Sequence, residues 1–173
     1  MKRLIGTLAL TLLTACGGTT IALPGGAGPG ASTVPRDFDP RGPATSTNDQ
    51  SFVALLNDYR TSVGSGPLTY DARLNAAAQG HADDMLANDY FSHTDRKGGL
   101  VQDRIRAQGY EPENYAENLA KGQQSDAAVI RDWKNSPSHD RAMKADTLDE
   151  FGLGVAGSGG NTRWALVMAK EAK

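Results

Sequence analysis

Apolar residues recur at helical spacing in four segments of the chain. They fall three or four positions apart over residues 52–59, 74–85 and 101–107, and again between residue 129 and Trp133. The second segment is rich in alanine and includes His81, which we expect to be a core histidine with a satisfied hydrogen bond. Trp133 continues the apolar face of the last of these segments, so we expect it in the core and not in a ligand site. Residues that can cap helices precede three segments: Asn48 or Asp49, Asp71, and Ser125 or Asp126.

The end of the chain has a pattern typical of strands. Residues 151–156 and 163–169 are mostly apolar, and the glycine-rich residues 157–161 separate them, so they predict an antiparallel hairpin. The letters G-L-G-V-A-G at residues 152–157 match a dinucleotide-binding loop. That loop must open a helix, whereas here a turn and a strand follow, so the match does not indicate a nucleotide site.

The first 47 residues have neither pattern. Lys2 and Arg3 precede an apolar run that ends at Leu13, as in a secretory signal peptide, and this run is shorter than the roughly 20 residues that span a bilayer. Gly, Pro, Ser and Thr then dominate up to Thr47, and such a segment cannot bury enough apolar surface to order itself. We therefore predict three parts: a signal peptide over residues 1–15, a flexible tether over 16–47 and one folded domain over 48–173.

The signal segment ends in Leu13-Thr14-Ala15-Cys16, which resembles the lipobox of bacterial lipoproteins. The resemblance implies cleavage before Cys16 and acylation of this cysteine, for example with palmitate; ordinary cleavage that leaves a free thiol is the alternative. Cys16 is the only cysteine, and a lipid would explain an unpaired thiol in an exported protein. We expect an extracellular, lipid-anchored protein of the cell envelope. Gly17 in place of an inner-membrane-retaining Asp favours the outer membrane, if the host has two.

The net charge limits which partners the protein can bind, and the cysteine content limits what can stabilise its fold. The chain has a formal net charge of −2, and without residues 1–15 it keeps 16 Lys and Arg against 20 Asp and Glu, or −4. This mild acidity, without a basic block, argues against nucleic acid and against electrostatic adhesion to anionic lipid. Since one cysteine cannot form a disulfide within the chain, the domain must depend on its core and its hydrogen bonds.

Residues 133–141 carry the clearest candidate chemistry. Pro137 forces the residue before it out of the helical region, so the preceding helix must end and the chain must turn. His139 can then face a cleft. The alternative is that Ser136 or Ser138 caps a following short segment and that His139 is only an exposed residue of its first turn.

Three motifs follow one another along the chain and are separated by predicted helices. They are Phe91-Ser92-His93-Thr94, Ala116-Glu117-Asn118-Leu119-Ala120 and Trp133-x-x-Ser136-Pro137-x-His139-x-Arg141. Together with Leu55-Leu56-Asn57-x-x-Arg60 and the turn Pro67-Leu68-Thr69-Tyr70-Asp71, they resemble the CAP superfamily of cysteine-rich secretory, antigen 5 and pathogenesis-related-1 proteins, in its bacterial SCP-like branch.

The resemblance covers about residues 48–170 and implies an α+β fold. This fold is a three-layer α-β-α sandwich with a small antiparallel sheet and a shallow cleft, which His93, Glu117 and His139 would line. Ser136 stands where larger eukaryotic members commonly carry a glutamate, and the eukaryotic disulfides are absent. We expect Asn118 to use its amide on backbone groups and so to fix the direction of Glu117.

Two imidazoles and a carboxylate fit a zinc-like ion with an open position for water, with His93 and His139 as nitrogen ligands. The same trio could instead be a metal-free hydrogen-bonded cluster. Two functions follow from these alternatives. The first is a non-catalytic, membrane-tethered module that binds an envelope component, a lipid or a protein. The second is a metal-assisted, peptidase-like hydrolase with Glu117 as general base.

Overall fold

The computed structural model describes residues 47–173, so the predicted signal peptide, Cys16 and nearly all of the tether lie outside the described residues. Its elements are α1 (Thr47–Ser62), β1 (Thr69–Tyr70), α2 (Ala72–Ala87), α3 (Val101–Ala107), β2 (Pro112–Lys121), α4 (Asp126–Lys134), α5 (Pro137–Lys144), β3 (Glu150–Ala156), a 3-10 turn (Gly159–Asn161) and β4 (Arg163–Glu171). Within this part of the chain, no helix has the length and apolar character needed to cross a membrane.

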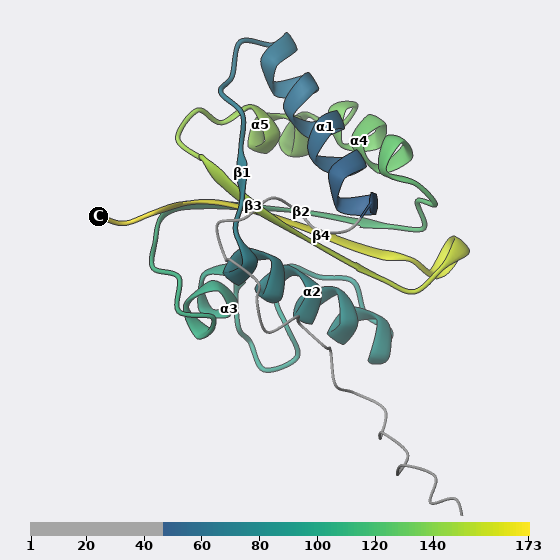
Figure 1. Ribbon diagram of the computed structural model, residues 1–173. Helices are drawn as coiled ribbons and strands as arrows, with labels where there is room; N and C mark the ends of the chain where they lie inside the picture. The colour runs from purple at the N-terminus through teal and green to yellow at the C-terminus, as the bar shows by residue number, and fades with distance from the viewer. Residues whose placement is uncertain (1–46) are drawn as a thin grey trace, which may run out of the picture. The chain divides into compact units, whose positions relative to one another are not determined.

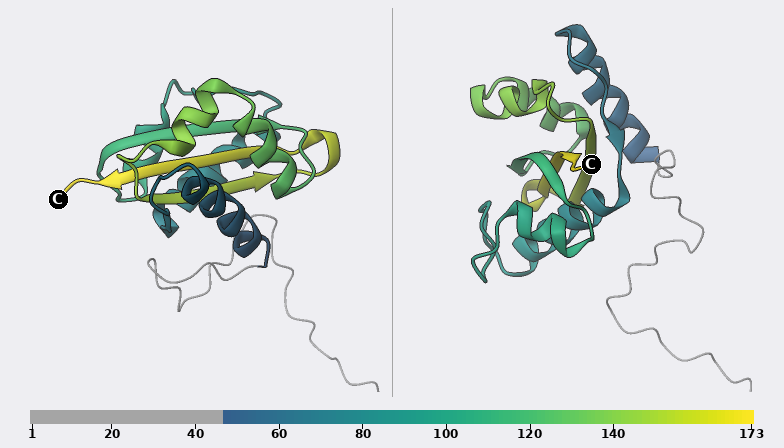
Figure 2. Two further views of the ribbon diagram at one scale, coloured as in Figure 1. Left: turned by 90° about the horizontal axis from the view of Figure 1, so that it is seen from above. Right: turned by 90° about the vertical axis from the view of Figure 1, so that its left-hand side faces the viewer.

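The four strands form one mixed sheet in the order β1-β3-β4-β2. β3 and β4 make the predicted antiparallel hairpin, β2 pairs antiparallel with β4, and the two residues of β1 pair parallel with β3. Helices α1, α4 and α5 cover one face of the sheet, and α2 and α3 cover the other (Figure 1). Figure 2 shows the same two layers from above and from one end. The three-layer α-β-α sandwich is thus confirmed, and β1 adds a parallel pair to the expected antiparallel sheet.

Helix ends follow the local sequence in most places. Asp71 accepts hydrogen bonds from two backbone N–H groups of α2, and Ser125 accepts one from the first turn of α4, as predicted. Pro137 is the first residue of α5, so the turn after α4 leads directly into another helix. The prediction for α1 was wrong, because the helix begins at Thr47 and includes both Asn48 and Asp49. No glycine or proline lies between Thr47 and the apolar face, so nothing stops the helix from starting earlier.

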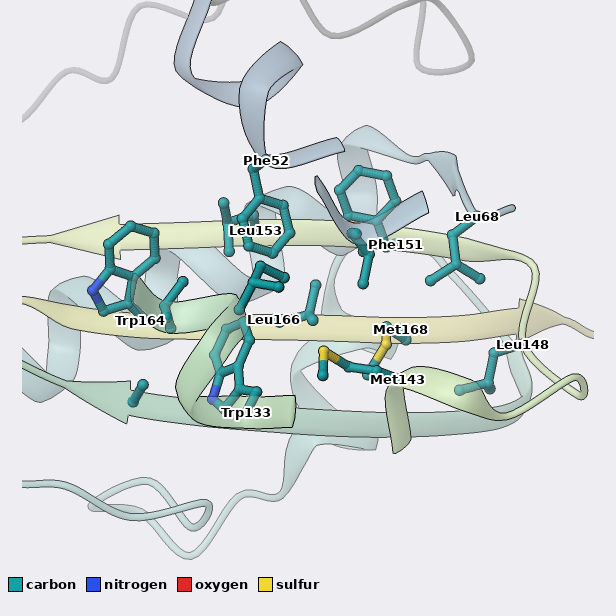
Figure 3. Close-up of a cluster of buried hydrophobic side chains, with 14 residues drawn as sticks. Phe52, Leu68, Trp133, Met143, Leu148, Phe151, Leu153, Trp164, Leu166 and Met168 are labelled. Atoms are coloured by element: carbon teal, nitrogen blue, oxygen red, sulfur yellow. The ribbon is translucent and has the colours of Figure 1, made fainter. Parts of the chain in front are cut away.

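The layer of α1, α4 and α5 packs large side chains on the sheet. The indole of Trp133 is 1% exposed and lies edge-on to Phe52, with ring centroids 6.3 Å apart (Figure 3). Its Nε1–H donates to the carbonyl of Leu119 in β2 over 3.1 Å, so the polar edge of the buried ring is also satisfied. Trp133 is therefore a core residue, as predicted.

The layer of α2 packs by close approach of backbones. A Cβ atom at Gly154 would lie 2.3 Å from the carbonyl carbon of Ala78, and one at Gly152 would lie 2.0 Å from a backbone nitrogen of α2. These glycines therefore serve helix packing, which agrees with rejecting the dinucleotide loop. Gln79 of α2 also accepts from the N–H and donates to the carbonyl of Val155, both over 3.0 Å. The side chain of Gln79 thus binds the backbone of β3 at a position where the short β1 no longer pairs with it.

Candidate functional site

The edge strand β2 connects the sheet to both helical layers. Successive side chains of a strand point to opposite faces. Leu119 packs in the core beneath α2, so Glu117, two residues earlier, points to the same face. Asn118 points to the other face, where its amide donates to the backbone carbonyl of His139 over 3.0 Å. Asn118 does bond to backbone as predicted, but it holds the first turn of α5 and does not contact Glu117.

Glu117 is buried and bound on both of its carboxylate oxygens. Its side chain is only 2% exposed. His93 Nδ1 lies 2.8 Å from Oε1, and Arg104 Nη2 lies 2.7 Å from Oε2. A buried carboxylate needs such partners, because an unpaired charge in this position would be very costly. The predicted residues His93 and Glu117 are therefore in direct contact.

Arg104, on α3, is the site residue that the sequence analysis missed. Its guanidinium donates to the carbonyl of His93 over 3.2 Å and to the carbonyl of Gly99 over 3.3 Å, besides its ion pair with Glu117. It therefore ties the loop between α2 and α3 to β2. One signal was available in the sequence: Arg104 shares a helical face with Val101 and Ile105, at spacing i, i+3, i+4. An arginine on an apolar face is expected to find a buried partner.

His93 and His139 approach the edge of β2 from different layers. His93 precedes α3, and 59% of its side chain is exposed. His139 lies in the first turn of α5 and is half-buried. Its place in the first turn agrees with the alternative interpretation of residues 133–141, although the side chain is not fully exposed. That its imidazole faces a cleft stays a prediction. We refer to His93, Arg104, Glu117 and His139 as the His93 site.

The two imidazoles have pKa values shifted in opposite directions. The hydrogen bond with Glu117 raises the pKa of His93, although burial and the charge of Arg104 oppose this shift. Burial lowers the pKa of His139, and the charge of His93 lowers it further. The environment therefore favours a proton on His93 over one on His139.

His81 is a core histidine, as predicted. It is 1% exposed, and its Nε2 lies 2.9 Å from the backbone carbonyl of Ser92. Burial lowers its pKa, so the ring is held neutral and Nε2 is the nitrogen that donates. His81 thus supports the loop that carries His93 and is not itself an exposed site residue.

The His93 site offers few free donors for a metal ion. Within residues 47–173, no group of three or more His, Cys, Asp or Glu side chains is placed to hold a metal ion. Both oxygens of Glu117 already bind protein donors, so the carboxylate would have to release His93 or Arg104 to act as a ligand. The nitrogen atoms of His93 and His139 are the remaining ligand candidates, and zinc binding by these two residues stays a prediction.

The fold and the His93 site together define a CAP-type domain. The family model for the cysteine-rich secretory protein family, CAP, matches residues 53–169. The chain therefore belongs to this family, as its three motifs predicted.

Two curated relatives come from Bacillus subtilis. The "uncharacterized membrane protein YlbC" is 30% identical over 109 residues, which are 63% of this chain and 32% of that protein. The "uncharacterized protein YkwD" is 29% identical over 116 residues, 67% of this chain and 45% of that protein. The chain thus matches less than half the length of either relative.

Two solved structures have the same fold. An extracellular protein containing an SCP domain from Bacillus anthracis has a TM-score of 0.66 at 22% identity, covering 75% of this chain and 45% of that one. An outer surface protein from Borrelia burgdorferi has a TM-score of 0.67 at 22% identity, covering 75% of this chain and 96% of that one. At this identity the similarity supports the fold alone.

Proposed function

We propose that this protein is a cell-envelope binding module, which recognises an envelope component through the surface around His93 and is tethered by a lipid on Cys16. The observation that carries this proposal is the contrast within the His93 site. The imidazole of His93 is mostly exposed, whereas Glu117 and Arg104 behind it are buried and bonded to each other. A polar group whose orientation is fixed by a buried pair loses little entropy on binding, which is what a recognition site needs.

The same contacts make Glu117 a poor general base. A base must present a free lone pair to water or substrate within hydrogen-bond distance. The two oxygens of Glu117 accept from His93 and Arg104, and the side chain is almost completely buried. Binding of a ligand by His93 therefore leaves this carboxylate in place. Base catalysis by Glu117 would require the carboxylate to rearrange.

The second candidate is the metal-assisted hydrolase, and the observation that favours it is that both histidines are bonded to adjacent residues of β2, His93 to Glu117 and the backbone of His139 to Asn118. These two imidazoles would hold the ion, and the ion would supply an activated water. Titration calorimetry with zinc tests this requirement: a saturable heat that weakens as the pH falls through about 6.5 supports a histidine-bound metal. If the protein gives no saturable heat at neutral pH, the metal-dependent hydrolase is excluded.

A binding assay separates the two candidates. The full chain carrying Cys16→Ser, which should lack the lipid anchor, is mixed without detergent with envelope fractions and, separately, with a peptide library, each with and without a chelator. We expect saturable retention on the envelope fraction that the chelator does not change. His93→Gln should weaken retention at least about tenfold, the value of one good hydrogen bond to a charged group. Lys97→Gln, an exposed residue of the same loop, is the matched control. Chelator-sensitive peptide turnover without retention would contradict the binding proposal.

The lipid tether is tested separately. The lipobox-like residues 13–16 support it, and so do the names of two similar proteins, one described as a membrane protein and one as an outer surface protein. We expect the parent to partition into the detergent phase and Cys16→Ser to remain in the aqueous phase. If Cys16→Ser still fractionates with membranes as the parent does, the protein is attached in another way.

A further inference from the structure

A hollow on the outer side of α4 and α5 lies apart from the His93 site. Its lining residues are Lys134, Asn135, Pro137, Asp140, Arg141, Lys144 and Ala145. The five lining residues from Pro137 to Ala145 recur three and four positions apart, so they lie along one face of α5. His139 is two positions from Arg141 and therefore points to a different side of α5. The hollow is thus a separate surface, which the proposed function does not use.

Two cations of this hollow, Lys134 and Arg141, form no ion pair with another residue of the part of the chain that the structure describes. Asp140 is the only carboxylate of the hollow, and it is already paired: Lys144 Nζ lies 2.5 Å from it, and the hydroxyl of Tyr59 donates to it. The ammonium of Lys134 lies 4.4 Å from the centre of the Tyr59 ring. Arg141 is exposed and forms no ion pair with another residue of the described chain. Positive charge therefore gathers here in a protein whose formal net charge is −2.

The unpaired groups are suited to a phosphate. The planar guanidinium of Arg141 can bind two oxygens of one oxyanion, and Lys134 adds a second full charge. Asn135 contributes an amide that can donate to a third oxygen. A phosphate monoester carries about −1.5 to −2 charges at neutral pH, which matches two cations outside ion pairs better than a single carboxylate does.

The size of the hollow indicates that the ligand is larger than the phosphate group alone. Its volume is about 580 Å³, within the roughly 300–1,000 Å³ of small-molecule sites. Pro137 and Ala145 add apolar wall to the charged groups. We propose that this hollow on α4 and α5 binds a phosphate monoester of a small polyol or sugar, either free or as the headgroup of a lipid.

Calorimetric titration of the full chain carrying Cys16→Ser, without detergent and at low salt, tests the site. Glycerol 3-phosphate is the probe, glycerol is the uncharged control ligand, and vesicles containing phosphatidic acid present the same phosphate monoester on a lipid. We expect saturable binding of glycerol 3-phosphate and none of glycerol. Arg141→Gln and Lys134→Gln should each weaken binding by about tenfold or more, the loss of one charge-assisted contact.

Two matched variants distinguish this site from the alternatives. Lys121→Gln removes an exposed cation of β2 that is not part of the hollow, and it should leave binding unchanged. His93→Gln should also leave it unchanged, while it weakens retention on envelope fractions. The failure of one proposal is therefore distinguishable from the failure of the other. Melting curves of all variants show whether each one is folded.

Five outcomes are decisive. Binding of both glycerol 3-phosphate and phosphatidic acid supports the site and admits a lipid source, and binding of the soluble ester alone supports a free ligand. Binding of the vesicles without the soluble ester overturns the proposal in favour of a charged membrane-facing surface. An equal loss in Lys121→Gln, or no saturable heat from glycerol 3-phosphate with the parent, overturns it as well.

Discussion

The two helical layers pack on the sheet in opposite ways. On the face of α1, α4 and α5, large side chains such as Phe52, Trp133 and Trp164 fill the space. On the face of α2, alanines of the helix meet Gly152 and Gly154 of β3, and the backbones approach closely. Large buried side chains therefore hold the first layer on the sheet, whereas in the second layer the missing side chains of Gly152 and Gly154 also let α2 lie close to β3. This difference predicts that each layer is sensitive to the opposite kind of mutation.

The largest effect is expected from removing volume in the first layer. Trp133→Ala should lower the free energy of unfolding by roughly 3–5 kcal/mol, the usual cost of deleting a large buried aromatic side chain. Denaturant titration measures it. Arg131→Ala, at an exposed position of the same helix, should change stability by no more than about 0.5 kcal/mol. A loss below about 1 kcal/mol for Trp133→Ala would contradict its role as a core residue.

Adding one methyl group should damage the second layer. Gly154→Ala places a Cβ against the backbone of α2 and should cost roughly 1–3 kcal/mol in the same titration. Gly160→Ala is the matched control, because no atom lies within 4 Å of the Cβ it would add. If both substitutions cost the same, α2 can shift away from β3 without penalty and the comparison between the layers fails.

The His93 site joins the two layers, and its two histidines should respond to pH in opposite senses. The pKa of His93 is raised in the folded protein, so its contribution to stability is present below the unfolded value of about 6.5 and is lost as the pH rises through the folded value. The pKa of His139 is lowered, so its contribution is present above about 6.5 and is lost as the pH falls through the folded value.

NMR titration of the ring protons measures both pKa values. Glu117→Gln should lower the pKa of His93, because it removes the hydrogen-bonded charge that raises it. Glu113→Gln, an exposed residue of the same strand, should leave the pKa of His93 unchanged. If the two variants gave the same pKa for His93, the contact with Glu117 would not be the cause of the shift.

The smallest effect is expected from removing the segment before the domain. Residues 48–173 contain both cores, so this fragment should unfold cooperatively, with a free energy close to that of the full chain. Circular dichroism during thermal unfolding of the two proteins makes the comparison. Non-cooperative melting of the fragment would show that the domain begins earlier in the chain than the sequence predicted.

The sequence alone determined those features that depend on neighbouring residues. The period of apolar residues predicted α1, α2, α3 and α4, Asp71 and Ser125 predicted two of their caps, and the glycine-rich turn predicted the hairpin of β3 and β4. The burial of Trp133 and His81 followed from the same period, because a helical face is set by spacing along the chain. The order of the three motifs was enough to indicate the family.

Only the tertiary structure decided which distant residues meet. The sequence did not show that β2 is an edge strand whose adjacent residues, Glu117 and Asn118, contact opposite layers. It also did not pair Arg104 with Glu117, because α3 and β2 come together only when the chain is folded. The partner of a buried charge depends on distances in space, and periodicity along the chain carries no information about them.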